Sequence, residues 1–154
     1  MRVVIQRVSR ASARVDAEIV GEIGQGALIL AGVKDGDTED DVRYLAGKIP
    51  NLRIIADGDK HFESSVMETG GSALVVSQFT LYADTRKGRR PSFLEAAQPA
   101  EAERLYELLV TELRGQGLTV ETGRFGAIMD VELVNDGPVT IIIDSADRQR
   151  ARRG

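Results

Sequence analysis

Short apolar segments separated by turn residues constrain most strongly what this chain can fold into. Residues 11–16 alternate apolar and polar side chains with a period of two, which is typical of a strand that is buried on one face. Residues 27–33 are apolar throughout, which predicts a central strand covered on both faces. The same reasoning predicts further strands over residues 3–8, 19–23, 52–56, 72–81, 118–121, 127–134 and 139–144.

Two other segments show the spacing of helices. Over residues 38–49, Thr38 is suited to cap a helix, acidic residues follow at the positive end of its dipole, and Pro50 ends it. The second predicted helix begins near Pro99 and ends at Gly115. Because strands dominate and the two helices do not alternate with them, we expect a single α/β domain. In that domain, mixed or antiparallel β-sheets are layered with about two helices.

The length and composition predict one soluble domain. The 154 residues are assigned to a domain over 1–145 and a basic, flexible tail over 146–154. There is no cysteine, which excludes disulfides, a thiolate nucleophile and cysteine-ligated zinc. No apolar run approaches the roughly 18 residues of a membrane span. The first residues lack the continuous apolar stretch of a signal peptide, so we expect a cytoplasmic protein without membrane contact.

The charge is acidic overall but unevenly distributed. The net charge of -4 argues against a broad nucleic-acid-binding surface. Residues 35–41 hold five acids, whereas residues 86–90 and the arginines of the tail are basic. A local basic patch can hold a phosphate backbone even on an acidic protein. The alternative is that these basic segments are solvated, which we favour for the tail.

Residues for catalysis by a conventional route are few. His61 is the only histidine, so a triad or a histidine-ligated metal would have to use it, and its place after a hairpin turn indicates a surface residue. No P-loop or Gly-x-Ser-x-Gly motif is present. The acids of residues 35–41 do not match an EF-hand and suit a helix start better. None of these residues therefore indicates a metal site.

Two polar segments are unusual for purely structural sequence. Ser77, Gln78 and Thr80 follow a strongly apolar strand, where partly buried polar side chains need hydrogen-bond partners or serve a site. Residues 135–140, Asn-Asp-Gly-Pro-Val-Thr, lie between two predicted strands and also suit a turn. From the residues alone, both the functional and the structural interpretation stay open for each segment.

These segments, with others in the same order, carry a family resemblance. The matching stretches are residues 6–8, 11–12, 21–24, 70–71, 77–81, 83–84, 90–93, 122–125 and 135–140. Each is weak alone, but their joint order and spacing are specific. Over residues 1 to about 144, the chain resembles the D-aminoacyl-tRNA deacylases.

The resemblance implies a homodimeric hydrolase of the ester bond in D-aminoacyl-tRNA, which performs chiral proofreading. The active site would lie at the subunit interface, with residues 77–81 of one subunit lining the pocket. Gly137 and Pro138 of the other subunit, joined by a cis peptide bond, would reject L-amino acids. A rigid backbone that blocks one side-chain direction rejects that enantiomer by steric clash. Glycine has no side chain, so glycyl-tRNA is expected to escape this filter.

The resemblance also implies roles for single residues. Ser77, Gln78, Phe79 and Thr80 would form the catalytic segment, with backbone N–H groups near Phe79 and Thr80 holding the carbonyl oxygen. The resemblance implies that the 2'-hydroxyl of the terminal ribose takes part, and the lack of a histidine partner for Thr80 is compatible with this. It implies no metal and no organic cofactor. Phe79 would pack against the terminal adenosine or against the core.

Two supporting residues and one departure complete the expected site. Arg7 would support the Gly-Pro motif, with a solvated strand arginine as the alternative. Met129 would lie near the pocket or in the core. Residues 61–65 depart from the family pattern, which leaves local substrate contacts open. The rival functions are an RNA-binding module without catalysis and a hydrolase of other small D-aminoacyl or glycyl esters. Neither DNA nor a membrane is an expected partner.

Overall fold

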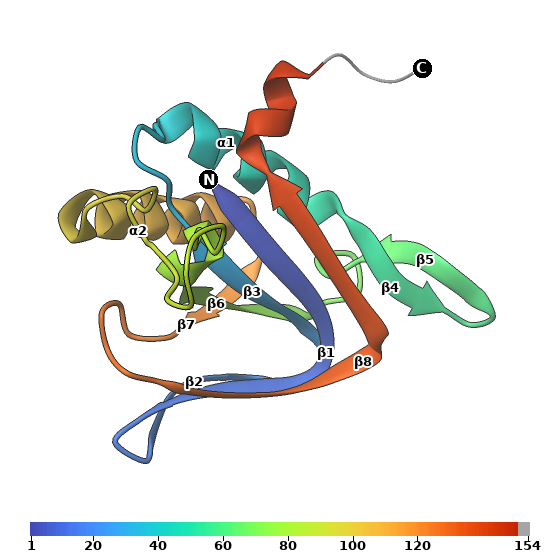
Figure 1. Cartoon of the computed structure of the whole chain (residues 1–154). Helices are drawn as coiled ribbons and strands as arrows, with labels where there is room; N and C mark the ends of the chain where they lie inside the picture. Colours follow the sequence, from blue (N-terminus) through green and yellow to red (C-terminus); the bar gives the residue numbers. More distant parts are fainter. Residues whose placement is uncertain (151–154) are drawn as a thin grey trace.

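The computed structural model describes residues 1–150 and contains a strand-rich sheet with two α-helices (Figure 1). The strands are β1 (Arg2–Val15), β2 (Glu18–Ile23), β3 (Gly26–Gly32), β4 (Arg53–Asp57), β5 (Lys60–Ser65), β6 (Ser72–Ser77), β7 (Thr119–Thr122) and β8 (Asp130–Asp144). The helices are α1 (Glu39–Lys48) and α2 (Pro99–Gly115), with short 3-10 helices η1 (Ile49–Asn51), η2 (Phe79–Tyr82) and η3 (Ser145–Gln149). The mixed α/β domain expected from the sequence is confirmed.

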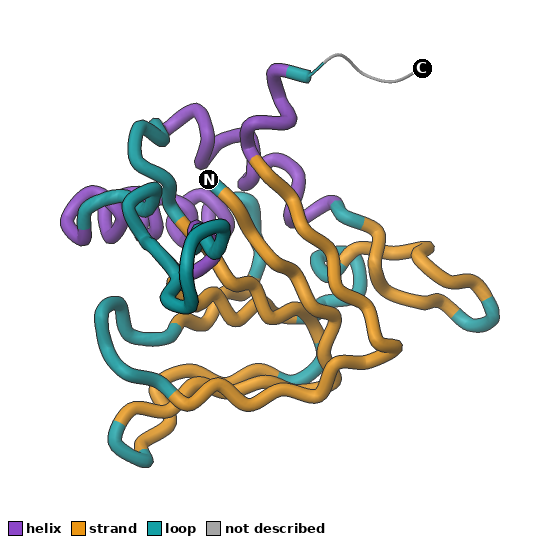
Figure 2. The backbone as a smooth tube through the Cα atoms, in the orientation of Figure 1, coloured by secondary structure: helices purple, strands orange, loops and turns teal. Residues whose placement is uncertain are grey.

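The long strand β1 organises the main sheet, whose order is β2-β1-β3-β6-β7, with β8 also paired to β1. The first half of β1 pairs with β3 and the second half with β2, both antiparallel. The β3–β6 and β6–β7 pairs are parallel. Because β1 and β8 bend and run together along their length, the sheet curls back on itself into a barrel-like form (Figure 2).

Two apolar clusters stabilise this arrangement. The larger lies between the sheet and the two helices, where α2 contributes Leu105, Leu109 and Leu113, each fully buried. The smaller lies inside the curl of the sheet and includes Val8 and Leu74. Full burial of a leucine or valine side chain contributes about 1.5–3 kcal/mol. Both faces of β3 and β6 are therefore covered, as their continuous apolar sequence predicts.

Both helices begin for the reasons expected, whereas α1 passes at its end into η1, which contains Pro50. In α1, the Thr38 N–H donates to Asp41 Oδ2 at 2.8 Å, and acidic residues occupy the first turn. Pro99 is the first residue of α2, where its missing N–H is not needed. Helix α2 is further tied to the sheet because the Tyr106 hydroxyl donates to the Val75 carbonyl oxygen at 2.8 Å.

The strand predicted over residues 72–81 is too long. Strand β6 ends at Ser77, because its partner β3 has pairing residues only as far as Ala31. The Gln78 N–H then donates to the Ala31 carbonyl oxygen at 2.8 Å, and the chain turns into η2. Phe79 and Thr80 therefore stand on a 3-10 turn beyond the sheet.

The turn predicted between residues 127–134 and 139–144 does not reverse the chain. Both halves belong to β8 and pair with β1 in the same direction. Gln6 pairs with Thr140 and Val8 with Asn135, so four residues of β8 bulge opposite Arg7. Within the bulge, Asn135 Oδ1 accepts from the Val139 N–H at 3.0 Å. This hydrogen bond from the backbone to the Asn135 side chain stabilises a bulge, whereas the sequence predicted a turn between two strands.

The beginning of the segment assigned to a flexible tail is helical. Residues Ser145–Gln149 form the 3-10 helix η3. Arg148 Nη2 lies 3.6 Å from Asp41 Oδ1 of α1. Arg152 and Arg153 lie outside the described residues. Within residues 1–150, no helix has the length and apolar composition needed to cross a membrane.

Candidate active site

A pocket of about 590 Å³ opens beside the ends of β3 and β6. Its walls come from three separate segments: the residues that follow β6, the start of α2, and the loop before β8. The lining residues are Ala31, Val33, Val76, Ser77, Gln78, Phe79, Phe93, Ala96, Ala97, Gln98, Pro99, Ala102, Phe125, Gly126, Ala127, Ile128, Met129 and Val131. The pocket is therefore mainly apolar, with few polar side chains, as small-molecule sites are.

The wall that follows β6 is the segment that the sequence singled out. Ser77, Gln78 and Phe79 all line the pocket. The Phe79 ring is 56% exposed and meets the Phe93 ring edge-on, with centroids 5.1 Å apart. Of the two alternatives for Phe79, packing in the core is therefore excluded. An exposed aromatic pair at the pocket offers a flat apolar surface on which a planar ring can pack.

Thr80 does not line the pocket, but it is coupled to the wall because the Gln78 side-chain amide donates to its hydroxyl. The backbone around it has free donors. The Gln78 and Leu81 N–H groups bond to carbonyl oxygens, whereas those of Phe79 and Thr80 donate to no backbone oxygen within residues 1–150. Free N–H groups at the start of a helical turn can stabilise a developing negative charge.

Met129 lies on the opposite wall. Its sulfur accepts from the Arg124 N–H at 3.4 Å. A Cβ at Gly123 would lie 2.6 Å from the same sulfur, so a glycine there leaves room for the methionine. Met129 also packs against the apolar cluster inside the curled sheet. Both expectations for Met129, pocket and core, therefore apply to the same side chain.

The Gly-Pro motif lies in the bulge of β8, where the Gly137–Pro138 peptide bond is cis. Arg7 holds this bulge from β1. Its Nε donates to the Asp136 carbonyl oxygen at 2.9 Å, and its Nη1 donates to the Ile54 carbonyl oxygen at 2.8 Å. Arg7 is 8% exposed, so the alternative of a solvated strand arginine is excluded. Charged donors that satisfy buried carbonyls contribute about 1.5–3 kcal/mol each.

The motif and the pocket are not brought together within one chain. Gly137 and Pro138 are exposed, and neither lines the pocket. The bend of β8 lies at one end of the curled sheet, and the loop before β8 lies at the other (Figure 1). The predicted site residues thus form two groups, one at the pocket and one around the bulge.

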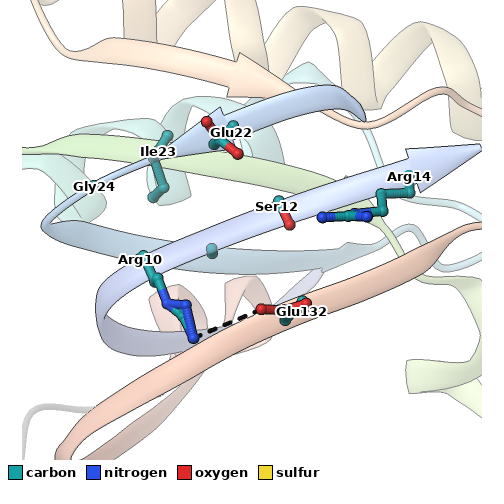
Figure 3. Close-up of a pocket in the computed structure, with 8 residues that line it drawn as sticks. Arg10, Ser12, Arg14, Glu22, Ile23, Gly24 and Glu132 are labelled. Atoms are coloured by element: carbon teal, nitrogen blue, oxygen red, sulfur yellow. Dashed lines mark ion pairs between the residues drawn. The ribbon is translucent and has the colours of Figure 1, made fainter. Parts of the chain in front are cut away.

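A second hollow lies on the outer face of β1, β2 and β8 and is lined by two arginines and two glutamates (Figure 3). Ser12 pairs across the strands with Glu22 and Glu132, and Arg10 lies 3.7 Å from Glu132. These opposite charges neutralise one another. His61, exposed on β5, lines neither this hollow nor the main pocket. No group of three His, Asp or Glu residues in the described chain stands together as metal ligands would.

Several pocket residues were not predicted. Phe93 and Phe125 lie in stretches that carried the family resemblance. The resemblance therefore marked these segments, but it gave the two phenylalanines no role. The wall formed by Ala96–Pro99 had no signal, because those residues are ordinary at a helix start. Only the fold shows that this helix start faces the end of β6.

The fold and the pocket define a single-domain α/β protein whose polar segment, after a central strand, borders an apolar pocket. A sequence model of the family described as D-Tyr-tRNA(Tyr) deacylase matches residues 4–144. A D-aminoacyl-tRNA deacylase of Dehalococcoides mccartyi is 59% identical over 153 residues, covering 99% of this chain and 100% of that protein. One of Roseiflexus sp. is 60% identical over 146 residues, covering 95% and 94%. The chain belongs to the D-aminoacyl-tRNA deacylase family.

Solved structures agree with this fold. One named c-Myc DNA Unwinding Element Binding Protein is 39% identical, with a TM-score of 0.89, and the match covers 94% of this chain and 98% of that one. A second, described as a probable eukaryotic D-amino acid tRNA deacylase, has a TM-score of 0.79 at 18% identity and covers 93% and 98%. At that identity, the second likeness concerns the fold alone.

Proposed function

We propose that this protein hydrolyses the ester bond of D-aminoacyl-tRNA and releases the free D-amino acid and tRNA in the cytoplasm. Family membership over the whole domain supports the reaction. The observation that carries it to this chain is the convergence of Ser77, Gln78, Phe79 and Met129 on one mainly apolar pocket. The pocket receives the aminoacyl-adenosine end of the substrate, whose base packs on the Phe79 and Phe93 rings.

The chemistry assigned to this site is modest, because an aminoacyl ester is already activated. Water adds to the ester carbonyl carbon, and the negative charge that develops on the carbonyl oxygen is held by the Phe79 and Thr80 N–H groups. The bond from the carbonyl carbon to the ribose oxygen then breaks, and that oxygen takes up the proton that the attacking water gives up. The neighbouring 2'-hydroxyl of the substrate assists this proton transfer. The Thr80 side chain positions Gln78, and no nucleophilic role is assigned to it.

Selection against L-amino acids is assigned to Gly137 and Pro138 of a partner subunit. Their exposure supports this role, since a motif that enters a neighbour's pocket must project from its own subunit. The hydrogen bond from Arg7 to Asp136 supports it further, because it fixes the backbone just before the motif, and the bond to Ile54 anchors the arginine itself. A fixed backbone wall rejects a side chain by clash and needs no affinity for the accepted enantiomer.

A symmetric homodimer would bring the two groups together twice. A partly exposed apolar row crosses the sheet from Leu30 through Val4 to Ile142, which are direct neighbours in the strand pairing. Ile142 is 65% exposed. Exposed apolar rows on a sheet are typical of interfaces. In a two-fold dimer each subunit contributes the same surface, so each pocket would receive the other subunit's motif.

The substrate is assigned as tRNA, although one similar solved structure bears the name of a DNA-binding protein. The chain has a net charge of -4, and within the described residues its excess basic charge is confined to the loop that contains residues 86–90. This distribution does not favour a surface that binds duplex DNA. A hydrolase of small D-aminoacyl esters remains the rival. Competition by uncharged tRNA separates these possibilities, since an enzyme of small esters would be indifferent to it.

Paired measurements on D-tyrosyl-tRNA and L-tyrosyl-tRNA test the proposal. We expect the protein to release D-tyrosine and to spare the L form. Equal release from both would keep the hydrolase and refute the role of Gly137 and Pro138. Release from neither by the folded protein would refute the enzyme and favour the RNA-binding alternative.

A further inference from the structure

An exposed basic hairpin beside the pocket has no part in the function described above. We define the basic hairpin as residues 84–92. Its ends are joined by two backbone hydrogen bonds of 2.8 Å between Asp84 and Ser92. Four cations and one carboxylate give it a net charge of +3, on a chain whose net charge is -4. The hairpin is therefore opposite in sign to the protein as a whole.

One of its four cations is already neutralised. Arg86 Nε and Nη2 lie 2.9 and 2.6 Å from the two carboxylate oxygens of Asp84. Hydrogen bonding from Arg86 lowers the pKa of the Asp84 carboxyl to about 2, so the pair stays charged. The other three cations, Lys87, Arg89 and Arg90, are exposed and form no ion pair within residues 1–150. Three cations are thus free to meet a polyanion.

The hairpin is attached to the pocket at both ends. Phe79 precedes it and Phe93 follows it, and these two pocket residues are in contact. Arg90 is three residues from Phe93, a distance of at most about 10 Å along an extended chain. A substrate whose last nucleoside packs on the two rings would therefore carry its preceding phosphates toward Arg90 first, and then toward Arg89 and Lys87 further along the hairpin.

We propose that the basic hairpin binds the phosphodiester backbone at the 3' end of tRNA while the terminal aminoacyl-adenosine occupies the pocket. This inference rests on the proposed function and names the part of the substrate that lies outside the pocket. Phosphate contacts supply affinity and position without reading bases, so one hairpin can serve many tRNAs. The rest of the chain carries the net negative charge and repels the same polyanion, which favours its approach at the hairpin.

The first test is binding of uncharged tRNA, measured by fluorescence anisotropy over a series of salt concentrations. The variant K87A/R89A/R90A removes the three free cations, and R10A/R14A/K48A removes the same charge from other exposed sites. We expect the hairpin variant to raise Kd at least about tenfold and to lower the salt slope by about 2, because each single-strand phosphate contact contributes about 0.7. Equal weakening in the matched variant would show that only net charge matters and would overturn the proposal.

The second test separates this proposal from the proposed function. D-tyrosyl-adenosine carries no phosphodiester, so the hairpin variant should hydrolyse it as the unmodified protein does and lose kcat/KM only on D-tyrosyl-tRNA. Equal loss on both substrates would place the hairpin in the pocket chemistry and overturn its role in phosphate binding. If the unmodified protein hydrolyses neither substrate, the proposed function fails, and the anisotropy measurement still decides whether the hairpin binds tRNA.

Discussion

At the scale of single residues, the bulge of β8 depends on one buried guanidinium. Arg7 donates to the carbonyl oxygens of Asp136 and Ile54, and so connects β8 with the β4–β5 hairpin. Gly137 approaches the same side chain so closely that a Cβ there would lie 2.8 Å from Arg7 Nη2. The motif assigned to chiral selection is therefore placed by the fit between an arginine and a glycine.

Replacing Gly137 with alanine should displace the motif. The new methyl group would meet Arg7 Nη2 and also Val139 Cγ2 at 2.9 Å, and the φ of +133° is unfavourable for an L side chain. A wall displaced by about 1 Å no longer blocks an L side chain in the same way, and misplacement of that size can change a rate on the order of 10²-fold. We expect the ratio of D to L hydrolysis, measured as kcat/KM on the two tyrosyl-tRNAs, to fall by that order. Gly47→Ala is the control, because nothing lies within 4 Å of its Cβ position. An unchanged D to L ratio in Gly137→Ala would refute the placement.

Replacing Arg7 with lysine should loosen the motif without removing the charge. One ammonium cannot span the Asp136 and Ile54 carbonyls as the guanidinium fork does. We expect the free energy of unfolding to fall by about 1.5–3 kcal/mol, because one charged hydrogen bond is lost. We also expect the ratio of D to L hydrolysis to fall, which a purely structural role would not cause. Arg10→Lys, on the same strand but exposed, should change neither quantity. If the D to L ratio of Arg7→Lys is unaltered, the positioning role is refuted, whatever the stability of the variant.

At the scale of elements, the periodicity of apolar residues predicted those helices and strands whose apolar side chains face the core. Helix α2 and strand β3 lie where the sequence placed them, because their apolar positions face one continuous core. The end of β6 and the bulge of β8 were missed for a different reason. Where β6 stops depends on the length of its neighbour β3, and the bulge depends on pairing with β1, and neither partner can be read from the local sequence. The sequence predicted that residues 77–79 line the pocket. The wall at the start of α2 could be recognised only from the fold.

The contact between α2 and β6 offers a test of how firmly the pocket walls are joined. Burial raises the pKa of Tyr106 to about 12, so its hydroxyl stays protonated and donates to Val75. Tyr106→Phe removes that donor but keeps the ring, and the Val75 oxygen retains the Gly123 N–H at 3.2 Å. We expect a loss of about 0.5–1.5 kcal/mol in the free energy of unfolding, measured by urea denaturation. Tyr44→Phe, on α1 and partly exposed, is the matched control. A loss above that range would mean that the hydroxyl does more than donate one bond.

At the scale of the whole molecule, one subunit contains both halves of the proposed site but cannot join them. The pocket opens beside the ends of β3 and β6, whereas the Gly-Pro motif projects from the bend of β8. In the proposed two-fold dimer, the apolar row Leu30–Val4–Ile142 of each subunit would face the same row of the other. Chiral selection and association would then be linked, since each pocket would receive the Gly-Pro motif of the second subunit.

Ile142→Glu tests that link. The side chain is 65% exposed, so the substitution should leave the fold of a single subunit nearly unchanged. At a two-fold interface it would bury two unpaired carboxylates, and removal of each charge from water costs several kcal/mol. Sedimentation should therefore show monomers at concentrations where the unmodified protein is dimeric. Rejection of L-tyrosyl-tRNA should be lost in parallel, because no partner motif reaches the pocket.

Ile19→Glu provides the comparison, since Ile19 is an exposed isoleucine on β2 and lies outside the apolar row. It should leave both association and chiral selection intact. A dimeric Ile142→Glu would place the interface elsewhere on the sheet. A monomeric but fully active and D-selective variant would be more decisive, because it would show that one chain completes its own site. The chiral selection would then have to come from residues within the pocket.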